Sequence, residues 1–274
     1  MKIQNFTLLS IICWVFIFTL QYDCKAQDRP SESVIQSPST FLWLGSYGRF
    51  RIGEKLYWDA QFHYRTTEFD GTPYIGRLVQ IYNRHGLVYM ITPNFSATLG
   101  PVLRLNFNQN PGDPNFTSLR LEPRIWHEYI FSIPFERLTL FHRLRFEHRW
   151  SRGNAIDADW IYRDRWRYKI FANIPLNTRK MQPGTFFFTP DFEIIMQSGK
   201  PVVDSPLEDL RINPTIGYIA NPRVKYTASM MYTTGQQLNR GWEYNSRWIL
   251  RLNVYVSLDF RKFEEKVQET RIED

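Results

Sequence analysis

Residue-by-residue alternation between apolar and polar side chains runs through long stretches of this chain and restricts its fold more than any other feature. In the clearest stretch, Leu56, Trp58, Ala60, Phe62 and Tyr64 alternate with residues that carry polar groups. Because successive side chains of a β-strand point to opposite faces, such a stretch gives a strand with one apolar and one polar face. No helical period competes with this pattern, so the sequence predicts an all-β fold.

Segments of this kind, mostly about 10 to 15 residues long, follow one another along the chain. They are 41–50, 56–65, 77–91, 95–107, 118–132, 137–150, 160–173, 185–197, 209–220, 223–234 and 246–260. Short connections alternate with longer ones, as in outer-membrane barrels with short periplasmic turns and long external loops. Since bacterial single-chain barrels have an even number of strands, one of these eleven segments should be assigned wrongly. We expect a single antiparallel transmembrane β-barrel, preceded by a cleaved signal peptide, with 10 to 12 strands.

The N-terminus has the features of a secretory signal peptide. Lys2 precedes an almost wholly apolar run from Phe6 to Leu20, which is shorter than the roughly 20 residues of a membrane-spanning helix. Cys24-Lys25-Ala26 places small residues at the −3 and −1 positions of a cleavage site, so cleavage is expected after Ala26. The expected division is 1–26 signal peptide, 27–40 N-terminal extension, 41–260 barrel and 261–274 charged tail.

Composition narrows the functional classes. Both cysteines, Cys13 and Cys24, lie in the removed segment, so disulfides and cysteine catalysis are excluded from the mature chain. The net charge is +7, and loss of Lys2, Lys25 and Asp23 leaves +6. This excess of positive charge favours binding to nucleic acid, lipid phosphates or an anionic ligand, but export argues against nucleic acid. The aromatic content of 16% fits belts of Trp and Tyr at both membrane interfaces.

Charged residues at alternate positions of the middle segments are the candidate site residues. Arg or Lys facing lipid near the midplane costs about 2 to 4 kcal/mol, so the alternation places them in the lumen. This lumenal ion-pair ladder comprises Glu122, Arg124, Glu128, Arg143, Arg145, Glu147, Arg149, Arg163, Arg165, Arg167, Asp191 and Glu193. We favour a plug of ion pairs, because acids are interleaved with bases. The other interpretation is an anion-attracting pore, or a pocket for phosphate or carboxylate.

The hairpin between 118–132 and 137–150 predicts the register of this ladder. A two-residue loop at Phe135-Glu136 makes paired residue numbers sum to 271. The expected pairs are Glu128–Arg143, Arg124–Glu147 and Glu122–Arg149, with Trp126 covering Arg145. On the next hairpin, a sum of 358 pairs Arg165 with Glu193 and Arg167 with Asp191.

No catalytic or metal-binding constellation emerges. The histidines are His63, His85, His127, His142 and His148. Parity turns the last three outward, while a metal needs several converging ligands, so neither a metal nor a cofactor is expected. A hydrolytic barrel needs a Ser beside a His, and the nearest candidate, Ser151, lies on the face opposite that of His148. The sequence indicates no enzyme, and a lipid- or saccharide-modifying barrel enzyme is the alternative function.

Two strands and the Arg-rich strand after them resemble a known family. They read Glu-x-Arg-x-Trp at 122–126, Arg-Leu-Arg-x-Glu-x-Arg at 143–149 and Arg-Asp-Arg-Trp-Arg-Tyr at 163–168. These motifs are similar to those of the uncharacterised exported proteins called domain of unknown function 2490, common in the Bacteroidetes lineage. The resemblance covers nearly the whole mature chain. It implies an outer-membrane barrel without an assigned activity.

The partners expected follow from this location. They are outer-membrane lipid and lipopolysaccharide, with a small anionic ligand as the open alternative. The last segment alternates Val254, Val256, Leu258 and Phe260, which resembles the terminal strand that the barrel-assembly machinery recognises. The sequence thus predicts a structural or narrow transport barrel in the bacterial outer membrane.

Overall fold

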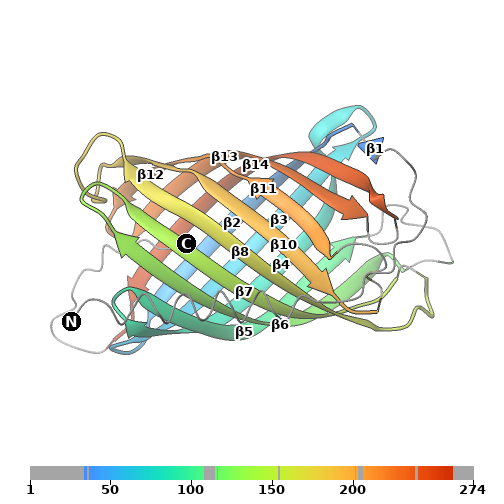
Figure 1. Cartoon of the computed structure of the whole chain (residues 1–274), viewed down its shortest axis with the longest axis horizontal. Helices are drawn as coiled ribbons and strands as arrows, with labels where there is room; N and C mark the ends of the chain where they lie inside the picture. The colour runs from blue at the N-terminus through green and yellow to red at the C-terminus, as the bar shows by residue number, and fades with distance from the viewer. Residues whose placement is uncertain are drawn as a thin grey trace. The chain divides into compact units, whose positions relative to one another are not determined.

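A computed structural model describes residues 34–35, 37–107, 115, 117–153, 155–200, 202, 206–237 and 240–261. The strands are β1 (Val34–Ile35), β2 (Ser39–Arg51), β3 (Leu56–Phe69), β4 (Thr72–Thr92), β5 (Phe95–Phe107), β6 (Leu119–Pro134), β7 (Thr139–Ser151), β8 (Ile161–Pro175), β9 (Phe186–Thr189), β10 (Asp191–Ser198), β11 (Leu207–Ile212), β12 (Thr215–Asn221), β13 (Val224–Gln237) and β14 (Arg240–Asp259) (Figure 1). Within these residues, no helix is long and apolar enough to cross a membrane. The predicted signal peptide, 1–26, lies outside the described residues.

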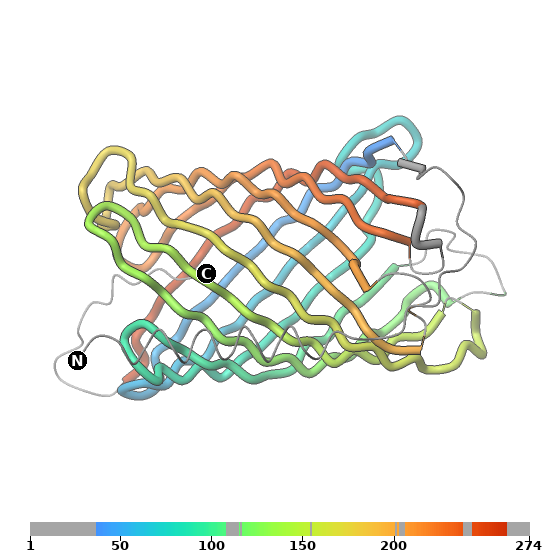
Figure 2. The backbone as a smooth tube through the Cα atoms, viewed as in Figure 1, coloured from blue at the N-terminus to red at the C-terminus, as the bar shows by residue number. Residues whose placement is uncertain are grey.

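The strands close into one barrel, which confirms the predicted fold class. Its wall has eleven strand positions, which we call staves; a stave consists of one strand or of two short strands in line. Two staves are interrupted: β9 and β10 both pair with β8, while β11 and β12 both pair with β13. The interruptions fall at Pro190 and Pro214, because proline has no N–H to donate to the sheet. Strands of the near and far walls cross in projection (Figure 2), as expected from the tilt of strands in a closed barrel.

The barrel closes through a parallel pair of strands. β14 runs alongside β2 in the same direction, from Arg247 opposite Ser39 to Asp259 opposite Arg51, and all other neighbouring staves are antiparallel. A parallel closing pair requires an odd number of staves. The expected even number was therefore wrong, and all eleven segments found in the sequence are staves. The same geometry puts the start of β2 and the end of β14 at opposite ends of the barrel.

The two faces of the wall differ in chemistry. Large apolar side chains such as Phe62, Leu99 and Ile125 are exposed on the outside, whereas charged side chains such as Arg124 and Glu147 are buried inside. This reverses the usual arrangement of a water-soluble domain. The interior also holds small apolar clusters, of which one joins Ile130, Phe141 and Phe171 on β6, β7 and β8.

The connections separate the two rims of the barrel. The short-turn rim carries 52–55, 93–94, 135–138, 176–185 and 222–223, together with the end of β14. The long-loop rim carries 70–71, 108–118, 152–160, 199–206 and 238–239, together with the start of β2. The connection between the predicted segments 56–65 and 77–91 is shorter than those bounds imply: it is a tight turn at Asp70 and Gly71, whose φ angles of 48° and 75° suit a two-residue hairpin loop.

Candidate functional site

All twelve residues of the predicted ladder lie on the inner face of the wall, where they are buried or line a cavity. They come from β6, β7, β8 and β10, four neighbouring strands. Strand alternation alone explains this, since every member shares the parity of the inner face. The predicted ladder residues are thus brought together, but not in the predicted register.

The register of the β6–β7 hairpin is shifted by two residues from the prediction. Glu128 lies opposite Arg145, Trp126 opposite Glu147, and Arg124 opposite Arg149. The cause is the position of the turn: Phe135 N donates to Leu138 O over 2.8 Å, so the chain reverses at Glu136 and Arg137, one residue later than predicted. Two like charges, Arg124 and Arg149, therefore face each other directly, an arrangement that is ordinarily destabilising.

Long arginine side chains remove this cost by reaching diagonally. Arg124 Nη1 contacts Glu147 Oε2 at 2.5 Å, and Arg149 Nε contacts Glu122 Oε1 at 2.9 Å. Arg143 Nε also lies 3.6 Å from Glu128 Oε2, so all three predicted ion pairs form, although in a different register. The guanidinium of Arg145 lies 4.9 Å from the Trp126 ring, as the sequence predicted.

The register of the β8–β10 pair also differs from the prediction. Glu193 lies opposite Lys169, so the paired numbers are four larger than expected. The stave breaks at Pro190, which the prediction treated as the middle of one strand. Arg167 consequently binds Glu193 at 2.7 Å rather than Asp191, and Lys169 binds Asp191 at 2.9 Å.

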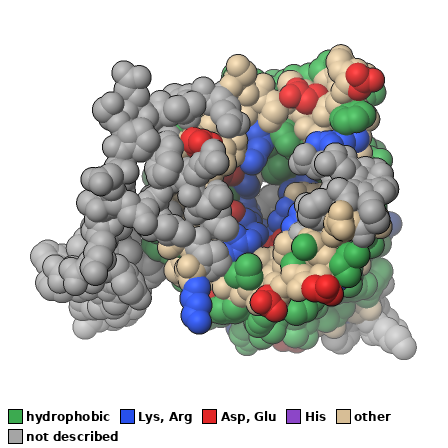
Figure 3. Space-filling view, turned by 90° about the vertical axis from the view of Figure 1, so that its right-hand side faces the viewer, with side chains coloured by type: hydrophobic (Ala, Val, Ile, Leu, Met, Phe, Trp, Pro, Cys, Tyr) green, Lys and Arg blue, Asp and Glu red, His purple; other side chains and the backbone are tan. Residues whose placement is uncertain are grey.

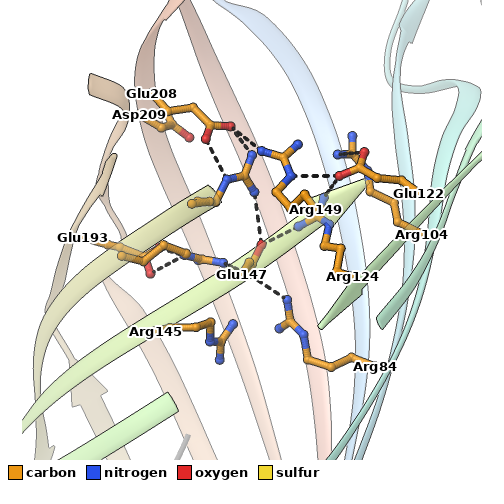
Figure 4. Close-up of polar contacts among 12 residues, drawn as sticks. Arg84, Arg104, Glu122, Arg124, Arg145, Glu147, Arg149, Glu193, Glu208 and Asp209 are labelled. Carbon is orange, nitrogen blue, oxygen red and sulfur yellow. Dashed lines mark hydrogen bonds and ion pairs between the residues drawn. The ribbon is translucent and has the colours of Figure 1, made fainter. Parts of the chain in front are cut away.

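Glu147 is the centre of the charged network (Figure 4). Its side chain is fully buried and lies within 2.5 Å of Arg124, 3.2 Å of Arg167, 3.3 Å of Arg84 and 3.5 Å of Arg165. A buried carboxylate loses its hydration, and closely held cations must replace it. Arg84 comes from β4, two strands beyond the neighbours of β7, so this contact spans part of the lumen.

Three further carboxylates each bind several arginines. Glu122 contacts Arg124 at 2.6 Å, Arg149 at 2.9 Å and Arg104 at 3.0 Å. Glu193 contacts Arg143 and Arg167, both at 2.7 Å, and Arg211 at 3.5 Å. Glu208 binds Arg165 through two oxygen–nitrogen contacts. These carboxylates therefore act as bridges between staves.

Sequence reasoning missed several members of this network. Arg84 and Arg104 lie on β4 and β5, whose inner faces mix charged with apolar residues and so gave no clear charged pattern. Glu208 was assigned to a loop, whereas it lies on β11. No local spacing could reveal these residues, because their partners lie on distant segments.

Two cavities occupy the lumen. The lower chamber, towards the short-turn rim, has a volume of about 170 Å³ and is lined by eleven bases and four acids. The vestibule, towards the long-loop rim, has a volume of about 830 Å³ and is lined by ten arginines and four acids. Both cavities are far more basic than the predicted ladder, in which ion pairs nearly balance. Figure 3 looks onto the long-loop rim, where Lys and Arg gather around the hollow.

A set of five residues lines both cavities, and we call it the waist: Trp43, Arg65, Tyr82, Arg165 and Arg211. The guanidinium of Arg65 lies 3.7 Å from the Trp43 ring and 4.4 Å from the Tyr82 ring. Arg211 on β11 reaches within 5.8 Å of the Trp43 ring on β2, across intervening staves. Side chains from distant parts of the wall therefore meet at the waist.

His127 and His148 stack with ring centroids 5.6 Å apart, while Ser151 has a hydrogen-bond partner of another kind. His148 Nδ1 lies 2.6 Å from Asp164 on the outer face, whereas Ser151 Oγ accepts a hydrogen bond from Arg163 over 3.1 Å. His63 is buried in the lumen beside Tyr47 and Tyr82. Among the described residues, no group of three or more His, Cys, Asp or Glu could hold a metal ion.

The comparison with protein families matches residues 40–245, which include every stave apart from most of β14. The chain belongs to the family described as protein of unknown function (DUF2490). Searches of curated proteins and of solved structures found no match. The family match contains all twelve ladder residues, so the lumenal network lies within the part of the chain that defines the family.

Proposed function

We propose that this protein is an exported barrel of the bacterial outer membrane whose positively charged lumen is closed at the waist at rest. The observation that carries this proposal is the pairing of an apolar outer face with an inner face whose charges are bound into a network. An outer face rich in exposed Phe, Leu and Ile is stable against lipid but not against water. Outer-membrane lipid and lipopolysaccharide would then be its surroundings.

The waist supports a closed lumen rather than an open pore. Arg65 and Arg211 both lie against Trp43, and Arg165 is tied to Glu147 and Glu208. A water-filled pore would instead need side chains that lie along the wall. The protein is therefore a structural or narrow transport barrel, and any passage through the waist favours anions because bases outnumber acids on both sides.

Cysteine labelling tests the membrane assignment. Single cysteines at Phe62, Leu144 and Phe146 should react with a lipid-restricted probe, whereas one at Arg145 should not. The mature chain without the predicted signal peptide has no other cysteine, so any labelling comes from the introduced residue. Recovery of the protein in the soluble periplasm, or lipid-probe labelling at Arg145 alone, would contradict the proposal.

The parallel closing pair gives a test of orientation. If long loops face outward, the exposed Ser37 lies at the cell surface and the exposed Glu54 in the periplasm. A membrane-impermeant maleimide applied to intact cells should label Ser37→Cys, and it should label Glu54→Cys only after lysis. The reverse pattern would show that the long-loop rim faces the periplasm.

A further inference from the structure

Several arginines of the lumen form no ion pair with a carboxylate among the described residues, and four of them carry the argument. Arg65, Arg120, Arg163 and Arg247 come from β3, β6, β8 and β14, and all four line the vestibule. Their contacts are neutral: Arg120 donates to Arg152 O over 3.1 Å, Arg163 to Ser151 Oγ over 3.1 Å, and Arg65 to Gln80 Oε1 over 3.3 Å. None of these side chains is thus in a direct ion pair with a carboxylate of the described wall.

The acids of the vestibule are already engaged. Glu122 binds three arginines, and Glu208 binds Arg165 and Arg149. Asp209 binds Arg211 at 2.7 Å, and Glu68 accepts hydrogen bonds from the amide and hydroxyl of Thr40. Rearrangement of the acids could neutralise the remaining arginines only by breaking these pairs.

Buried hydrogen-bond donors also lack acceptors in this region. The Nε atoms of Arg65, Arg104, Arg120 and Arg163 are buried and make no hydrogen bond to the described part of the chain. Buried polar groups in folded proteins are nearly always satisfied, by protein, water or ligand. Arginine nitrogens prefer planar anions, since a guanidinium can bind carboxylate or phosphate through two parallel hydrogen bonds.

Much of the remaining lining of the vestibule is polar and uncharged, beside apolar and aromatic side chains such as Phe41 and Val79. It includes Gln80, Asn106, Ser151, Asn245 and Ser246, whose amides and hydroxyls can bond to sugar hydroxyls. A volume of about 830 Å³ lies within the range of small-molecule sites and admits more than one sugar ring. Inorganic phosphate alone would leave most of this lining without contacts.

We infer that the vestibule is a binding site for an acidic saccharide that carries at least two phosphate or carboxylate groups. The anionic groups bind Arg120, Arg163 and Arg247, and the sugar hydroxyls bind the neutral lining. This inference rests on the proposed function in one respect, since a closed waist makes the vestibule a pocket rather than a passage. A free phosphorylated sugar and the phosphorylated sugars of lipopolysaccharide share this chemistry.

Isothermal titration with the mature protein in detergent micelles tests the site, with glucose 1,6-bisphosphate as the probe. We expect binding by the wild type and at least tenfold weaker binding by Arg120→Gln/Arg163→Gln. The matched control is Arg179→Gln/Arg223→Gln, which removes the same charge from exposed positions at the short-turn rim. Its affinity should stay within twofold of the wild type. Heat-modifiable migration in gels shows that each variant has folded.

Several results would overturn the inference. These are absence of binding, equal loss in both double variants, or competition by inorganic phosphate as strong as that by the sugar bisphosphate. A second arm uses purified lipopolysaccharide. Loss of lipopolysaccharide binding in Arg120→Gln/Arg163→Gln alone would support the site and name the membrane as the source. Because binding in micelles needs neither a membrane nor a closed waist, these outcomes are separate from those that test the proposed function.

Discussion

The lumen has two walls that hold their cations in different ways. On the wall formed by β6, β7, β8 and β10, carboxylates such as Glu147 and Glu193 bind several arginines each. On the wall formed by β13, β14, β2 and β3, cations lie against aromatic rings, as Arg65 lies on Trp43 and Lys225 lies 4.3 Å from the Tyr255 ring. We call these the acidic wall and the aromatic wall.

The difference shows where the lumen keeps positive charge that no carboxylate neutralises. A carboxylate neutralises an arginine, whereas an aromatic ring attracts a cation without removing its charge. The acidic wall is therefore cross-linked through its carboxylates, and its arginines without an ion pair among the described residues, Arg120 and Arg163, line the vestibule. The aromatic wall keeps positive charge that an anion can still use. The parallel closing pair, β2 with β14, lies in the aromatic wall.

The largest expected loss of stability follows from a substitution at the centre of the acidic wall. Glu147→Gln leaves Arg84, Arg124, Arg165 and Arg167 around a neutral group, so we expect a loss of about 3 to 5 kcal/mol in the free energy of unfolding. The measurement is the denaturant midpoint of the heat-modifiable gel shift. Glu54→Gln, at an exposed turn, is the control and should change stability by less than about 0.5 kcal/mol. A loss below about 1 kcal/mol at Glu147 would show that the network is not structural.

A smaller effect is expected on the aromatic wall. A double-mutant cycle with Trp43→Leu and Arg65→Gln should give a coupling free energy of about 1 to 2 kcal/mol, because the contact is a cation–π pair of limited exposure. The same cycle with Arg124→Gln and Glu147→Gln should give a larger value. Equal coupling in the two cycles would remove the distinction between the walls.

The smallest coupling free energy is expected for an ion pair near the short-turn rim, Arg49 with Asp59. Arg49 binds Asp59 through two contacts of 2.9 Å, but their side chains keep 21% and 12% of their exposure. Solvent screens such a pair, so its coupling should stay below about 1 kcal/mol and fall further in 1 M salt. Coupling that survives high salt would place this pair with the buried network instead.

Sequence reasoning predicted which side chains of a strand point into the lumen, but not which residues lie opposite one another on neighbouring strands. Alternation put Phe62 outside and Arg145 inside, since this depends only on the strand period. The predicted register was wrong because register depends on where the turn lies, and the chain after Pro134 reverses one residue later than predicted. The contact between Arg84 and Glu147 joins residues 63 positions apart, so no local pattern contains it.

The parallel closure was also beyond local patterns. Strand alternation says nothing about the direction in which the first and last staves meet, and the general rule of even strand numbers pointed the wrong way. The excess of bases was underestimated for a related reason. Arg104, Arg120, Arg211 and Arg247 lie on strands whose sequences lack a fully charged face, and only closure of the barrel gathers them around one cavity.

Current through single molecules in planar bilayers tests most directly whether the waist closes the lumen. The wild type should show no steady conductance, while Arg65→Ala/Tyr82→Ala/Arg211→Ala, which joins the vestibule to the lower chamber, should conduct and select anions. Tyr64→Ala, on the outer face, is the matched control and should stay closed. A steadily open wild type, or cation selectivity in the opened variant, would contradict the account.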